Sequence, residues 1–108
     1  MKKLCFMAVV VIAFLLFGCD LPDPEGPFNV IYHANAQDVS GFPPEDDNEY
    51  TKDMEAIVLG KNTMEKTGYT FLHWNTKADG TGDSYNEGDT LVIKNSTVFL
   101  YAVWTLDN

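Results

Sequence analysis

Hydrophobic and polar positions divide the chain into an apolar N-terminal run and a longer segment of short β-type patterns. The apolar run covers residues 4–17 and follows the basic pair Lys2 and Lys3. As a helix, such a run would be about 21 Å long, which is less than the bilayer core of about 30 Å. It therefore predicts the hydrophobic region of a secretory signal that is removed on export. An uncleaved membrane anchor is the alternative.

Strand-type patterns dominate the rest of the chain. Residues 55–59 form a short apolar run that stops at Gly60, and periodicity alone cannot separate a strand from a helical turn here. We expect no long helix and at most a short helical turn near residues 62–66, and residues 41–48 are expected to form an acidic loop. Four segments rich in β-branched and aromatic residues predict strands: 28–34, 69–75, 91–93 and 97–104.

The last of these segments is apolar on both faces. Alternation places Val98, Leu100, Ala102 and Trp104 on one side and Phe99, Tyr101 and Val103 on the other. Two interpretations follow. A loop or short helical turn covers the second face, or the face is an exposed patch that binds a partner. Four apolar residues at outward strand positions would form that patch: Ile31, Leu72, Phe99 and Val103.

Proline content marks the boundary between the export segment and the domain. Residues 20–27 contain three prolines, which favour an extended chain. We expect a signal peptide over 1–18, an acidic tether over 19–27, one β-rich domain over 28–105 and a tail over 106–108. Because the domain is near the lower size limit for an independent core, large side chains should anchor it. The expected core anchors are Trp74, Trp104, Phe71 and Tyr32.

The charge of the chain excludes two classes of partner, and its cysteines exclude a disulfide. The chain has 16 Asp and Glu against 7 Lys, with no Arg and a net charge of −9. Loss of Lys2 and Lys3 would leave 5 Lys against the same 16 acids, a net of −11. Such a domain lacks the footprint of a nucleic-acid-binding protein and is repelled by anionic lipid headgroups. Of the two cysteines, Cys5 would be removed with the signal, so no disulfide is expected.

No constellation of residues predicts catalysis. The only histidines, His33 and His73, lie within strands and have no evident ligand partners. Four acids near the glycine-rich turn at residues 79–82 lack the ligand spacing of a calcium-binding loop: Asp79, Asp83, Glu87 and Asp89. Asn75 and Asp79 are expected to cap turns instead. We therefore expect no enzyme, no metal, no cofactor and no small-molecule substrate.

Residues 16–19, Leu-Phe-Gly-Cys, resemble the lipobox of bacterial lipoproteins. Phe17 is bulkier than the residue usual at its position, but the basic start and apolar run lie at the proper distance. The resemblance implies cleavage between Gly18 and Cys19, and acylation of Cys19 with membrane lipid as the bound partner. Because one acyl chain holds only marginally, stable anchoring would need two or more.

Residues 29–105 resemble the Listeria–Bacteroides repeat, the family of the internalin B-repeat. The resemblance rests on Thr-Gly-Tyr-Thr-Phe at 67–71, Trp-Asn-Thr-Lys-Ala-Asp-Gly-Thr-Gly at 74–82 and Leu-Tyr-Ala-Val-Trp at 100–104, together with residues 30–35. Ala36 and Gln37 stand where the family has Gly-Gly, and His73 stands where it has Gly. The resemblance implies an α+β, strand-dominated, β-grasp-like domain without catalytic residues. Gly68 is expected to take a positive φ.

These features predict an exported, lipid-anchored and non-catalytic protein of the cell envelope. Its domain would present an interaction module at the surface, for adhesion or for contact with a host or matrix partner. The alternative is a structural envelope lipoprotein that binds a larger periplasmic or surface assembly.

Overall fold

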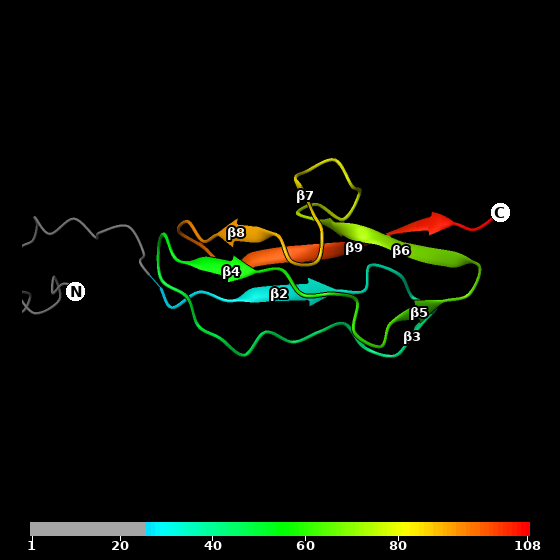
Figure 1. Ribbon diagram of the computed structural model, residues 1–108, viewed down its shortest axis with the longest axis horizontal. Helices are drawn as coiled ribbons and strands as arrows, with labels where there is room; N and C mark the ends of the chain where they lie inside the picture. Colours follow the sequence, from blue (N-terminus) through cyan, green and yellow to red (C-terminus); the bar gives the residue numbers. More distant parts are fainter. Residues whose placement is uncertain (1–25) are drawn as a thin grey trace, which may run out of the picture.

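The computed structural model describes residues 26–108 (Figure 1). The expected signal peptide, Gly18, Cys19 and the tether as far as residue 25 lie outside the described residues. Among the described residues, no helix is long and apolar enough to cross a membrane.

The main sheet has four strands in the order β2-β9-β6-β7. These are β2 (Val30–His33), β9 (Val98–Leu106), β6 (Tyr69–Asn75) and β7 (Ser84–Tyr85). The first and last of them in sequence, β2 and β9, pair in parallel, whereas β6 runs antiparallel to both β9 and β7. Segments from both ends of the domain thus lie side by side, with β9 inside the sheet and β2 at its edge.

Two small antiparallel sheets make a second layer. One pairs β4 (Glu55–Ile57) with β8 (Thr90–Val92), and the other pairs β3 (Val39–Ser40) with β5 (Glu65–Lys66). In Figure 1, β4 and β8 lie in front of the main sheet. The core forms between the layers, where Ala56 and Leu91 join a cluster that includes Leu100, Ala102 and Trp74 of the main sheet.

The prediction of an α+β, β-grasp-like fold is wrong, because residues 26–108 contain no helix and form a β-only domain. Residues 62–66, where at most a short helical turn was expected, contain a turn at 62–63 and no helix. Asn62 takes a φ of 57°, and the chain then enters β5, which pairs with β3. Residues 55–57 of the ambiguous run are a strand because they pair with β8, more than thirty residues away. Tertiary pairing therefore decides between the strand and the helical turn, a choice that the sequence left open for this run.

The four expected core anchors lie at different depths. Trp74 and Tyr32 are buried, whereas Phe71 and Trp104 are partly buried and pack against the core. The backbone of Leu59 holds the first two, since its N–H donates to Tyr32 Oη at 3.0 Å and its carbonyl accepts from Trp74 Nε1 at 2.8 Å. These two bonds fasten the chain after β4 to the inner face of the main sheet.

Candidate functional site

Strand β9 gives the main sheet an inner and an outer face. Leu100 and Ala102 point inward and are fully buried. Because successive side chains of a strand point to opposite sides, Phe99, Tyr101 and Val103 project outward. The inner face is covered by the second layer, and the outer face is the surface on the other side.

Strand register places further apolar and aromatic side chains beside these three. Ile31 lies opposite Phe99, and His33 lies opposite Tyr101. On β6 the register shifts between Phe71 and His73, and this irregularity leaves Leu72 exposed. We call the resulting surface the outer face. It consists of Ile31, His33, Leu72, Phe99, Tyr101 and Val103.

The outer face is open to solvent. Its exposed fractions are 38% for Ile31, 51% for Leu72 and 46% for Phe99, and Val103 is partly buried. At the end of this surface beside Tyr101, the loop that follows β6 covers Asn75, which is fully buried and donates to the Gly80 and Gly82 carbonyls. All four residues of the expected patch therefore lie on one surface, and three of them are exposed.

An aromatic stack runs across the outer face. The His33 ring lies 5.0 Å from the Tyr101 ring and 5.9 Å from the Phe99 ring, with interplanar angles of 15° and 18°. At the border of the face, His73 Nε2 is 3.3 Å from Ser84 Oγ. Sequence reasoning assigned neither histidine to this surface. Only the register of β2 and β6 against β9 brings them there.

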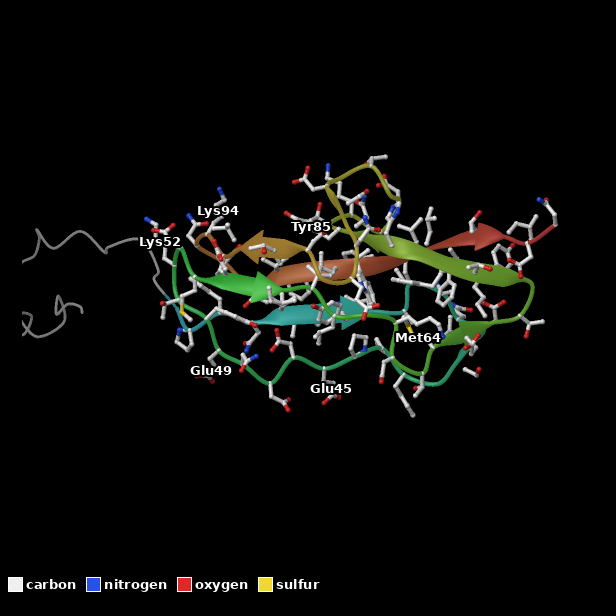
Figure 2. All side chains as sticks on the ribbon, viewed as in Figure 1. Glu45, Glu49, Lys52, Met64, Tyr85 and Lys94 are labelled. Atoms are coloured by element: carbon white, nitrogen blue, oxygen red, sulfur yellow. The ribbon has the colours of Figure 1, made fainter. Side chains whose placement is uncertain are left out.

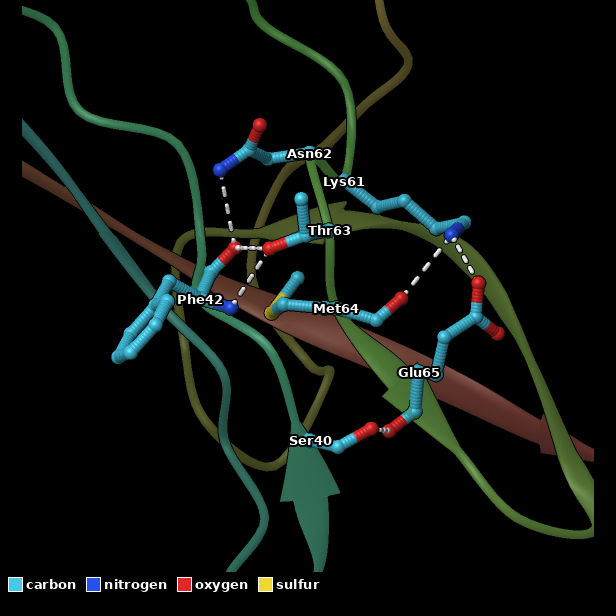
Figure 3. Close-up of polar contacts among 7 residues, drawn as sticks. All are labelled: Ser40, Phe42, Lys61, Asn62, Thr63, Met64 and Glu65. Atoms are coloured by element: carbon cyan, nitrogen blue, oxygen red, sulfur yellow. Dashed lines mark hydrogen bonds and ion pairs between the residues drawn. The ribbon is translucent and has the colours of Figure 1, made fainter.

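Phe42, which sequence reasoning also missed, is the most exposed large hydrophobic residue within residues 26–108, at 75%. Its backbone is held on both sides (Figure 3). The Phe42 N–H donates to Thr63 Oγ1 at 3.0 Å, and its carbonyl accepts from Asn62 Nδ2 at 3.2 Å. The ring therefore projects from a fixed loop between β3 and β4, outside the outer-face strands.

Polar side chains at and near the turn at residues 79–82 hold its backbone in place. Asp79 Oδ1 accepts from Thr81 Oγ1 at 2.7 Å and from its N–H at 3.1 Å, and these bonds hold the pKa of Asp79 below its usual range. Asn75, fully buried, accepts from the Lys77 and Gly82 N–H groups, both at 2.9 Å. Both residues cap turns as expected. Within residues 26–108 no group of His, Cys, Asp and Glu is arranged to hold a metal ion.

Formal charge is absent from the main sheet. None of the 16 acidic residues or 7 lysines lies in β2, β9, β6 or β7. Figure 2 shows Glu45 and Glu49 on the loop that passes below β2, and Lys52 and Lys94 at the end of the molecule near β4 and β8. The outer face is thus a neutral surface on a strongly anionic protein.

Comparison with known families agrees with these motifs. The profile of the Listeria-Bacteroides repeat domain matches residues 28–103, most of the chain. The chain belongs to this family. The matched segment thus includes every residue of the outer face.

Two relatives come from the bacterium Evansella cellulosilytica. One, named "Putative membrane protein", is 37% identical over 81 residues, which are 75% of this chain and 12% of that protein. The other, named "Putative Gly-rich membrane protein", is 45% identical over 53 residues, 49% of this chain and 6% of that protein. The repeat domain therefore matches only a small part of each relative. No solved structure matches the chain.

Proposed function

We propose that the chain is a non-catalytic, membrane- or surface-associated protein whose repeat domain binds a partner through the outer face. The observation that carries this proposal is the open apolar surface at Ile31, Leu72 and Phe99. Soluble domains rarely leave contiguous apolar surface uncovered unless it binds something. On this surface the apolar residues are adjacent by strand register, not scattered.

Membrane association rests on the N-terminal segment and on the relatives. Residues 4–17 have the composition of an export signal, and Cys19 would carry the lipid. Both Evansella proteins are named as membrane proteins. Lipid attachment accounts for how so anionic a domain stays at a membrane, since its charge opposes binding to anionic headgroups.

The partner belongs either to the surroundings of the cell or to its envelope. Adhesion to a host or matrix molecule requires that the domain face outward, whereas a structural envelope role does not. Protease treatment of intact cells separates the two, because only an outward-facing domain is degraded. A domain that stays intact until the cells are lysed excludes adhesion and leaves the structural role.

Photo-cross-linking tests the binding surface itself. The full-length chain is produced in bacterial cells with Phe99→p-benzoyl-phenylalanine, and the matched control carries the same group at Ile57. Ile57 is 56% exposed on β4, where its neighbour Ala56 points into the core. It therefore faces away from the outer face. We expect a protein adduct from position 99 and none from position 57. Absence of an adduct from position 99, or equal adducts from both, would contradict the proposal.

A further inference from the structure

The outer face joins three properties: it is apolar, it carries no formal charge, and its aromatic rings are already stacked. The chain as a whole has a net charge of −9, yet the strands that build this face contain no Asp, Glu or Lys. No Asp, Glu or Lys side chain on these strands could pair with a charged partner. The acidic groups lie on the loops instead, for example at residues 45–49.

From this distribution we infer that the outer face packs against the same face of a second copy of the chain, in a weak and symmetric dimer. This inference rests on the proposed binding function and names its partner. A two-fold contact places identical surfaces together, and two neutral faces bury no unpaired charge. Everywhere else, two such acidic chains repel each other. The outer face is the surface through which they approach at the lowest electrostatic cost.

The dimensions of the face fit a weak dimer. On β9 the outer face extends from Phe99 to Val103, about 17 Å, and three strands at about 4.8 Å spacing are about 14 Å wide. The face thus covers roughly 240 Å². It is about a third of the 800 Å² per partner found in standard stable complexes. The area supports reversible self-association and not a permanent dimer.

The side chains suit the packing of one sheet on another. Face-to-face sheets lie about 10 Å apart and interdigitate upright side chains. Near-parallel stacking of His33 with Tyr101 and Phe99 holds these three side chains as a row. Rings that are already ordered lose less conformational entropy when a partner covers them.

Sedimentation equilibrium of the purified full-length chain in detergent tests the inference. We expect the dimer fraction to rise with protein concentration, and also with NaCl from 0.05 to 0.5 M, because salt screens repulsion between the anionic copies. Phe99→Glu should raise the dissociation constant of the dimer at least tenfold. Ile57→Glu, which adds the same charge outside the outer face, should change this constant less than twofold. A chain that stays monomeric up to about 1 mM would overturn the inference. An equal rise in the dissociation constant for both variants would overturn it as well.

The mass of the photo-adduct separates this inference from the proposed function and does not depend on the folding of a charged variant. An adduct from position 99 with twice the mass of the chain supports the dimer. An adduct with a different protein overturns the dimer and leaves the proposed binding function standing. If no adduct forms, both fail.

Discussion

Leu59 shows how a single backbone position joins the two layers. Its N–H and its carbonyl bond to Tyr32 and Trp74, whose rings meet edge to face at 4.8 Å. The sequence marks both aromatic residues as large core candidates. It gives no sign that Leu59 lies between them, because that contact depends on how the chain after β4 crosses the sheet.

Tyr32→Phe should lower the free energy of unfolding by about 1–2 kcal/mol at neutral pH, because the Leu59 N–H loses its acceptor in a buried setting. The free energy of unfolding of the variant should also fall less as the pH rises into the alkaline range. Burial raises the pKa of Tyr32 above its ordinary 10.0, so its stabilising contribution is complete below that pH. It is lost as pH rises through the folded pKa.

Urea denaturation between pH 8 and 11 measures both effects. Burial also raises the pKa of Tyr50 and of Tyr85, so both proteins should lose stability in alkali, and wild type should lose more. An identical decline in the two proteins would show that Tyr32 does not contribute.

Adjacent residues of strand β9 belong to different parts of the domain, one to the core and the next to the outer face. Leu100 is fully buried, whereas Phe99 is 46% exposed on the outer face. Leu100→Ala should cost about 3–4 kcal/mol through cavity formation, and Phe99→Thr about 1 kcal/mol through loss of cross-strand contact. Guanidinium denaturation of the two variants checks the difference. Equal losses would mean that Phe99 belongs to a core and that the outer face is covered.

Two glycine turns should differ in their tolerance of a methyl group. Gly41 and Gly68 have φ values of 78° and 83°, which strain any other residue. A Cβ at Gly41 would collide with the Thr63 carbonyl, whereas space is open around Gly68. Gly68→Ala should therefore cost about 1 kcal/mol and Gly41→Ala roughly 2–4 kcal/mol, as measured by thermal unfolding. A larger loss at Gly68 would contradict the packing of Gly41 against Thr63.

Local pattern predicts some elements and misses others for identifiable reasons. Alternation in residues 98–104 predicts the two faces of β9, and the turn before Tyr69 predicts the positive φ of Gly68, which is confirmed. The sequence left β4 open between a strand and a helical turn and gave no sign of β5, because both are fixed by pairing with strands more than twenty residues away, β8 and β3. Short segments of two or three residues carry too little periodicity to reveal such pairing.

The candidate site was predicted only in part, for the same reason. Ile31, Phe99 and Val103 are apolar at positions that alternation places outward, whereas the exposure of Leu72 depends on the register shift between Phe71 and His73. The aromatic stack depends on His33 lying opposite Tyr101, a register that the sequence does not specify. Phe42 was missed because it lies in an acidic loop, where no periodicity marks its exposure.

At the scale of the whole molecule, charge and apolar surface are segregated. Acidic residues occupy the loops and the small sheets, and the main sheet presents a neutral outer face. This arrangement keeps the domain soluble through its net charge and leaves one surface for contact. We therefore propose that the outer face is covered by a partner in the cell.

Hydroxyl-radical footprinting of the full-length chain tests that claim most directly, by comparing intact cell envelopes with highly diluted purified protein. We expect Phe99, Tyr101 and His33 to react more slowly in the envelope than in the diluted protein. Phe42, on its separate loop, should react equally in the two samples. Equal reactivity of Phe99 and Tyr101 in the two samples would contradict the account.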